Sequence, residues 1–118
     1  MEIIGPLVQF QNQLQIFHWQ SRTYAQHKAF GHAYKSISGL IDTFVETYLG
    51  IFGNQESTIQ FSFTLKNLST DNINNALDDF LDFLDDITRT FVKNTDLINI
   101  KDTMLGDINQ LKYLLTLK

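Results

Sequence analysis

Apolar residues recur every three or four positions in four separate stretches of this 118-residue chain. In the first stretch, Ile3, Leu7 and Phe10 are followed at the same spacing by Leu14 and Phe17. Residues with this spacing lie on one face of an α-helix, the face that packs against other helices. The pattern therefore predicts four amphipathic helices. The other three rows are Phe30, Tyr34, Ile37, Ile41, Phe44, Tyr48 and Ile51; Ile73, Leu77, Phe80, Leu84, Ile87 and Phe91; and Leu97, Ile100, Met104, Ile108, Leu111 and Leu115.

The ends of the expected helices are marked by proline, glycine and hydroxyl residues. Pro6 suits the first turn of a helix and would be costly further along. Thr23 followed by Gln26 has the form of a capping box, in which the hydroxyl accepts a hydrogen bond from the first turn. The helices are expected to begin near Gly5 or Pro6, near Tyr24, after a cap at Thr70 or Asp71, and at Thr95 and Asp96, with the second ending at Gly50 or Gly53.

Between the second and third helices, Ile59, Phe61, Phe63 and Leu65 alternate with polar residues. Such alternation is typical of an extended strand, but no second strand is expected to pair with it. We interpret this stretch as a long crossover whose aromatic side chains pack on the bundle or on a partner subunit. The sequence thus predicts an all-α four-helix bundle, with one long crossover between helices two and three and a single domain over residues 1–118.

Composition excludes several classes of function. The chain has no cysteine, so disulfides, thiolate metal sites and cysteine nucleophiles are excluded. Its net charge is −4, and its basic residues are spread along the chain rather than gathered in a tail or stripe, which argues against a nucleic-acid partner. No apolar run is long enough for a membrane span, and the N-terminal residues do not resemble a signal peptide. A cytoplasmic protein without a membrane partner is therefore expected.

The candidate site lies within residues 18–50, which hold all three histidines and the only tryptophan. Asp42 and Glu46 are four residues apart and so share a helix face, beside apolar residues that would partly desolvate them. An unpaired carboxylate in such a place needs a cation, a hydrogen-bond donor or a metal. His18 and His27 supply imidazoles from nearby, with His32 as a further candidate. Carboxylates combined with imidazoles suit Fe(II), Mn(II) or Zn(II).

Simpler interpretations stand beside these. Asp42 and Glu46 could form a solvated face paired with Lys28, Lys35 or Arg22 from a neighbour. His18 could be a core histidine bonded to a backbone carbonyl at a helix end, and Trp19 an ordinary packing residue. The aspartates of the third helix are expected to form a solvent-facing acidic stripe, the alternative being a path that attracts Fe(II). These aspartates are Asp78, Asp79, Asp82, Asp85 and Asp86.

Two glycines fall inside the second helix, Gly31 and Gly39. Each lowers helix stability by about 1 kcal/mol relative to alanine. A glycine kept at such a cost indicates close approach by a neighbouring group, so both positions are expected to be crowded.

Residues 10–53 resemble the Dps family, the mini-ferritins named as DNA-binding proteins from starved cells. The resemblance rests on the His18-Trp19 pair at the end of the first helix, on His27 early in the second, and on Asp42 and Glu46 in the order Asp-x-x-x-Glu. Small uncharacterised ferritin-like proteins of bacteriophages are closer still. They share the runs HWQ at residues 18–20, YAQHKA-like at 24–29 and IDTFVETYLG-like at 41–50.

The resemblance implies that the four-helix bundle is ferritin-like. It also implies a ferroxidase site between two subunits of a homo-oligomer, at least a two-fold dimer and in the family a dodecamer. His18 and His27 of one chain and Asp42 and Glu46 of the other would bind Fe(II), which peroxide or oxygen oxidises. Trp19 would stand beside the metals and intercept radicals. Manganese and zinc are alternative metals.

The chain also departs from the family pattern. A further acid of the family falls on Gly31, with His32 next to it, and the lysine-rich extension used for DNA binding is absent. The alternative hypothesis is a non-catalytic, ferritin-like helical interaction protein, encoded by a phage and acting in the host cytoplasm, with a structural or vestigial metal site.

Overall fold

The computed structural model describes residues 1–54 and 60–117, and all regular secondary structure in these ranges is helical. Four helices were predicted and four are present, so the all-α class is confirmed. No strand occurs in the described residues, which include the alternating positions Phe61, Phe63 and Leu65. The helices are α1, Ile4–Gln20; α2, Tyr24–Phe52; α3, Thr70–Thr90; and α4, Thr95–Leu114.

The helix ends follow local capping chemistry. Thr23 caps α2, with its hydroxyl accepting a hydrogen bond from the backbone N–H of Gln26 (3.2 Å). Gly53 ends α2 at a φ of 81°, a left-handed conformation that favours glycine. The predicted cap of α3 was wrong by one residue, because Ser69 accepts from the N–H of Asn72 (3.0 Å) and the helix begins at Thr70.

Helix α1 begins at Ile4, slightly before the predicted Gly5 or Pro6. The side chain of Glu2 accounts for the difference. Its two carboxylate oxygens accept hydrogen bonds from the backbone N–H groups of Ile4 (2.8 Å) and Gly5 (2.9 Å). Those N–H groups have no partner within the helix, and a negative charge at this end also favours the helix dipole.

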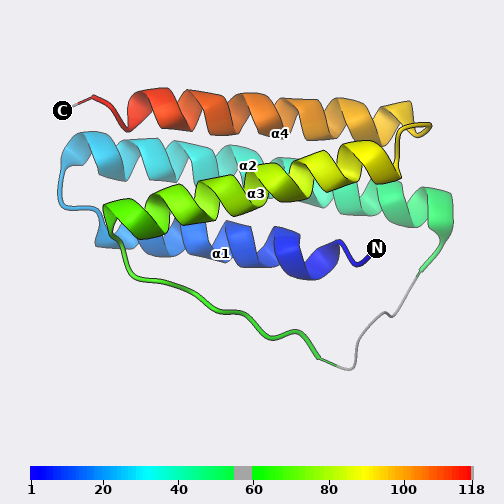
Figure 1. Ribbon diagram of the computed structural model, residues 1–118, viewed down its shortest axis with the longest axis horizontal. Helices are drawn as coiled ribbons and strands as arrows, with labels where there is room; N and C mark the ends of the chain where they lie inside the picture. The colour runs from blue at the N-terminus through cyan, green and yellow to red at the C-terminus, as the bar shows by residue number, and fades with distance from the viewer. Residues whose placement is uncertain (55–59, 118) are drawn as a thin grey trace.

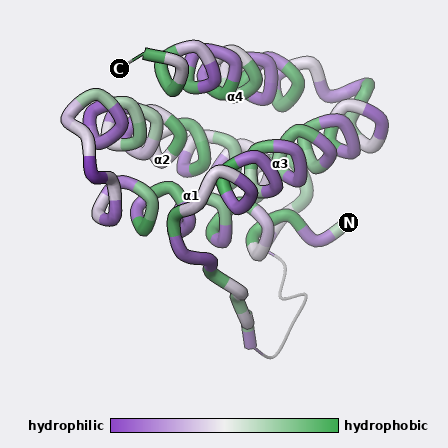
Figure 2. Tube along the Cα trace, turned by 60° about the vertical axis from the view of Figure 1, so that its left-hand side comes forward, coloured by the Kyte–Doolittle hydropathy of each residue, from purple (hydrophilic) through white to green (hydrophobic). Residues whose placement is uncertain are grey.

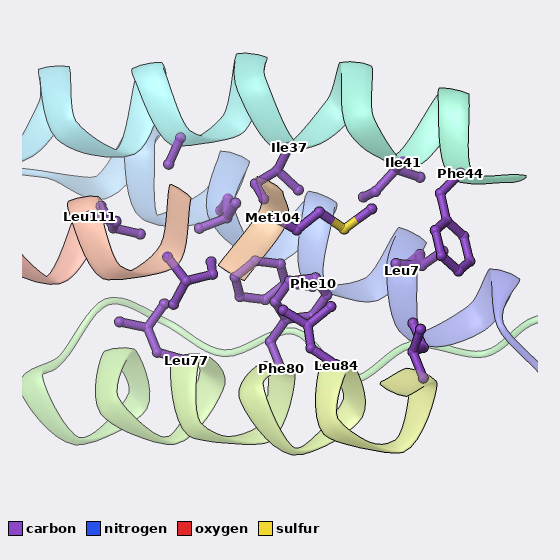
Figure 3. Close-up of a cluster of buried hydrophobic side chains, with 14 of the residues drawn as sticks. Leu7, Phe10, Ile37, Ile41, Phe44, Leu77, Phe80, Leu84, Met104 and Leu111 are labelled. Atoms are coloured by element: carbon purple, nitrogen blue, oxygen red, sulfur yellow. The ribbon is translucent and has the colours of Figure 1, made fainter. Parts of the chain in front are cut away.

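The predicted apolar rows meet in one core (Figure 3). Every predicted residue of the first and third rows is buried. The rows of α2 and α4 fit less closely. Ile51 of α2 is exposed, and Ile100 of α4 is only partly buried. The next residue of α4, Lys101, is buried beside the core instead. The ammonium of Lys101 lies 2.6 Å from the carboxylate of exposed Asp102, so the charge has a partner at the surface.

The helices form two antiparallel pairs. Helix α1 runs against α2 and α3 against α4, while α2 and α3 run in the same direction (Figure 1). Each helix contacts two others, so the order around the core is α1, α2, α4, α3. Hydrophobic and hydrophilic residues alternate around each helix, as expected for a bundle with one shared interior (Figure 2). This arrangement is compatible with a four-helix bundle.

Residues 60–69 run along α1 and are attached to it by glutamine side chains. The amide of Gln13 accepts from the N–H of Lys66 (2.7 Å) and donates to its carbonyl oxygen (2.8 Å). Gln9 accepts from the N–H of Thr64 (3.3 Å) and Gln20 from that of Leu68 (2.6 Å). The attachment is therefore made through the polar backbone of the segment.

The crossover side chains, which were expected to pack on the bundle or on a partner subunit, are only partly covered by the bundle in the residues described, and packing on a partner subunit stays a prediction. The side chains of Phe61, Phe63 and Leu65 are 47%, 37% and 40% exposed. Ile59, the fourth residue of that alternation, lies outside the described residues. Because glutamine side chains hold the segment by its N–H and C=O groups, its apolar side chains are left at the surface.

The acidic stripe of α3 faces solvent, as expected. Arg89 in the last turn pairs with both Asp85 and Asp86, and the hydrogen bond with Asp85 is the main cause that raises the pKa of the Arg89 guanidinium. None of the helices in residues 1–54 and 60–117 combines the length and apolar character that crossing a lipid bilayer requires.

Candidate metal site

Two predicted ligands meet where α1 ends and α2 begins. His18 lies in the last turn of α1 and His27 in the first turns of α2. The Nδ1 atom of His18 lies 2.8 Å from the carbonyl oxygen of His27, and Nδ1 of His27 lies 3.0 Å from the carbonyl oxygen of His18. The two rings stack, with centroids 3.9 Å apart and planes 21° from parallel. The tight turn between the helices thus brings both imidazoles together.

The reciprocal contacts assign the donor nitrogen of each ring. A carbonyl oxygen can only accept, so each Nδ1 carries a hydrogen and donates it. In a neutral imidazole the other nitrogen, Nε2, then has a free lone pair. His18 therefore does bond to a backbone carbonyl at a helix end, as the simpler interpretation held. The same bond orients a histidine for metal binding, because metal-binding imidazoles usually donate their second N–H to such an acceptor.

Gly31 makes room for this arrangement. A side-chain carbon at position 31 would lie 2.8 Å from Cε1 and 2.9 Å from Nδ1 of His18, closer than non-bonded atoms approach. The expected crowding at Gly31 is thus confirmed. At Gly39 no described atom outside the adjoining helix backbone lies within 4 Å of the equivalent position, so the same expectation was wrong there. The ring of His18 occupies the space that a larger residue at position 31 would need.

A cleft of about 790 Å³ opens beside the two rings. Its lining includes Lys28, His32 and Lys35, spaced four and three residues apart and therefore on one face of α2. Among the described residues, no aspartate or glutamate lines the cleft. The sequence analysis did not predict that lysines would gather beside the histidines. The helical spacing of Lys28, His32 and Lys35 could have indicated it. The cleft is suited to receive negatively charged groups.

Trp19 lines the same cleft with its side chain 64% exposed, so it is not an ordinary packing residue. Three further large apolar side chains at this end of the molecule are exposed: Tyr24 (76%), Tyr113 (63%) and Leu117 (49%). Leu117 also lines the cleft. A charged cleft beside exposed aromatic residues is typical of a surface that contacts another protein.

Asp42 and Glu46 do not join the histidines within one chain. Fifteen residues of α2 separate His27 from Asp42, which is about 22 Å along a helix axis. Both acids are exposed, so the expected desolvation was wrong: their side chains extend into solvent beside the buried row of Ile41 and Phe44. None of the ion pairs among the described residues includes Asp42 or Glu46, and pairing with Lys28, Lys35 or Arg22 from a neighbour stays a prediction.

Within the part of the chain that the structure describes, no three histidine, aspartate or glutamate side chains lie close enough together to hold a metal. The histidine pair offers two nitrogen ligands, and the acid pair offers carboxylates at a different place on α2. A four-ligand site from His18, His27, Asp42 and Glu46 therefore requires two copies of the chain.

A protein-family model matches residues 18–115, from His18 to the end of α4. The chain belongs to DUF5856, a family of unknown function. The DUF5856 match includes every candidate ligand and Trp19, together with α2, α3 and α4. Neither a curated protein nor a solved structure matches the chain.

Proposed function

We propose that this DUF5856 protein is a ferritin-like, Dps-type oxidoreductase that binds Fe(II) between two subunits and oxidises it with peroxide or oxygen. His18 and His27 of one chain and Asp42 and Glu46 of the other would hold the iron. In this proposal the parallel α2 and α3 and the long connection between them correspond to the ferritin-like crossover.

The observation that carries the proposal is the reciprocal hydrogen bonding of the two histidines. Each Nδ1 donates to the other residue's carbonyl oxygen, so both Nε2 atoms are available to a metal at the same cleft. One hydrogen bond to a backbone carbonyl would be enough to hold a single histidine at a helix end. Two histidines held in the same way place two nitrogen ligands side by side. Imidazole nitrogens suit Fe(II), and the mixed nitrogen and oxygen set also suits manganese and zinc.

Charge complementarity supports the pairing of two copies. The cleft gathers three histidines and two lysines without an acid, whereas Asp42 and Glu46 are exposed and unpaired among the described residues. A second copy related by a two-fold axis would place its acids in this cleft, and the same contact would form twice. The exposed aromatic residues beside the cleft would supply apolar area to the interface.

The chemistry follows from the ligand types. Carboxylate oxygens are hard donors that favour Fe(III) over Fe(II), so Asp42 and Glu46 promote the loss of an electron from the substrate. Peroxide needs two electrons and two protons to form two water molecules, and two Fe(II) ions supply one electron each. Reduction of peroxide by two electrons releases no hydroxyl radical. The exposed indole of Trp19 lies at the cleft, where it can reduce a radical that escapes.

The test is anaerobic titration of the apo-protein with Fe(II), followed by peroxide and measurement of ferric absorbance. We expect saturable binding and fast oxidation that Asp42→Ala and His18→Ala both lose. Asp71→Ala, which removes an exposed acid from α3 outside the acidic stripe, is the matched control and should oxidise iron like the wild type. Oxidation that is unchanged in Asp42→Ala would refute the proposal.

A second candidate function is a helical interaction protein without catalysis. The exposed Phe61, Phe63 and Leu65 favour it, because monomeric proteins rarely leave such a row uncovered. Fast oxidation of Fe(II) that depends on the histidines and acids would contradict this candidate, whereas metal that is bound but not oxidised would agree with a structural site. Absence of Fe(II) binding above background, with a stable folded chain, would favour it over the ferroxidase.

A further inference from the structure

The segment attached to α1 behaves as a strand with only one of its two edges paired. Thr64, Lys66 and Leu68, every second residue, donate their N–H groups to glutamines of α1. In an extended chain, successive residues direct their N–H and C=O groups to opposite sides. The residues that alternate with these three, Phe61, Phe63 and Leu65, therefore direct their N–H and C=O groups away from α1.

Helix and strand spacings explain why the attachment fits. Gln9 and Gln13 are four residues apart, which is about 6 Å along a helix. Thr64 and Lys66 are two residues apart, which is about 6.6 Å along a strand. Gln13 contacts both the N–H and the C=O of Lys66, as a residue of a neighbouring strand would. One edge of the segment is thereby satisfied within the chain.

The other edge is open. The backbone groups of Phe61, Phe63 and Leu65 make no hydrogen bond to any described residue, and the side chains of these residues are substantially exposed. An unpaired strand edge with apolar side chains is a template for pairing with another strand. Residues 60–65 read QFSFTL, without a charge or a proline to prevent such pairing.

We propose that this edge pairs with the same segment of a second copy of the chain, antiparallel about a two-fold axis at Phe63. In this register Phe63 faces Phe63 of the second copy, and Phe61 faces Leu65. Phe61, Phe63 and Leu65 then exchange backbone hydrogen bonds with Leu65, Phe63 and Phe61 of the second copy. Every facing pair of side chains is apolar.

A second copy is a better occupant than an unrelated peptide because the pattern is complementary to itself. Phe61 and Leu65 lie two residues on either side of Phe63. An antiparallel copy therefore places an apolar residue opposite each of the three. An uncharged segment also does not repel its own copy. This surface is separate from the histidine cleft, whose lining includes no residue of 60–67. The contact does not depend on the proposed iron chemistry.

The test uses the absence of cysteine from the chain. In the proposed pair the two Phe63 Cα atoms would lie about 5.5 Å apart, within the usual span of a disulfide. We expect Phe63→Cys, under mild oxidation at low protein concentration, to convert most of the chain to a disulfide-linked dimer. Val92→Cys is the control, because Val92 is 65% exposed in the turn between α3 and α4. Equal yields of linked dimer from the two variants would overturn the proposal.

A second measurement tests the contact without a crosslink. Phe63→Glu would place two like charges opposite each other at the axis, so we expect at least a tenfold weaker self-association in analytical ultracentrifugation. Ser62→Glu, which projects from the other face of the strand, is the matched control. Helical content should stay constant in both, since the glutamines bind the inner edge. Self-association unchanged by Phe63→Glu would refute this contact, while Fe(II) binding can be retained or lost independently.

Discussion

The imidazole of His18 lies directly over the α-carbon of Gly31, so that a methyl group at position 31 would be 2.8 Å from its Cε1 atom. The same ring bonds to the carbonyl of His27 and stacks on the ring of His27. The position of His18 therefore depends on a glycine one turn beyond its partner. Any displacement of the ring also breaks a hydrogen bond that orients the pair.

Gly31→Ala should move His18 and destabilise the protein. Alanine gains about 1 kcal/mol of helix propensity over glycine, but forced overpacking costs about 1–3 kcal/mol. We expect the free energy of unfolding, measured in urea, to fall by about 1 kcal/mol. Fe(II) binding should weaken with it.

Gly39→Ala is the matched control, because nothing lies within 4 Å of the added carbon. It should raise the free energy of unfolding by about 1 kcal/mol. The double variant His18→Ala, Gly31→Ala removes the ring that alanine meets, so it should be no less stable than His18→Ala alone. A stabilising Gly31→Ala would show that the His18 ring moves aside without loss.

Gln13→Ala should release the crossover from α1. Gln13 is buried and makes two hydrogen bonds with the backbone of Lys66. Their loss should lower the free energy of unfolding by about 1–2 kcal/mol and speed limited proteolysis within residues 60–69. Gln9 is exposed and makes one longer bond to Thr64, so Gln9→Ala should change stability by less than about 0.5 kcal/mol. Equal effects of the two variants would contradict this account.

Ser69→Ala should destabilise α3. The hydroxyl of Ser69 accepts from the N–H of Asn72, and the loss of a serine cap costs about 1 kcal/mol. Thr70 is exposed and is not the cap, so Thr70→Ala should change the denaturation midpoint little. A larger effect at Thr70 than at Ser69 would place the start of α3 one residue later.

Mixing two inactive variants should restore iron oxidation if the site lies between subunits. When His18→Ala and Asp42→Ala chains are unfolded and refolded together, roughly half of the dimers contain one chain of each, and each of these has one intact site of two. We expect roughly a quarter of the wild-type oxidation rate per chain. Refolding each variant separately before mixing is the control. No recovery after joint refolding would exclude a shared site.

The four helices were predictable because their signals act over a few residues. The apolar spacing of α1 and α3, the Thr23 cap and the glycine end of α2 each depend on neighbours within one or two turns. The errors were equally local. Ser69 and Thr70 both carry a hydroxyl that can cap a helix, and Ser69 is the one that caps α3. The carboxylate of Glu2 caps α1, so that helix begins closer to the N-terminus than predicted.

The crossover was predicted as an extended segment without a partner strand, but its attachment to α1 was not. Apolar residues at every second position suggested that the side chains of Phe61, Phe63 and Leu65 pack on the bundle or on a partner subunit. Glutamine amides of α1 bind the backbone instead, and their spacing along a helix matches that of a strand only when the two are placed side by side. Gln9 and Gln13 carried that signal, but nothing local indicated what they would bind.

By itself the sequence determined the helices, their buried rows and the residue types of the candidate site, because spacing and side-chain chemistry are properties of short stretches. Only the tertiary structure decided that His18 and His27 bond to each other, that Gly31 makes room for them, and that Asp42 and Glu46 extend into solvent about 22 Å away along α2. These relationships depend on how each helix is rotated about its axis and on which helix lies beside it, which is set by packing of the whole core.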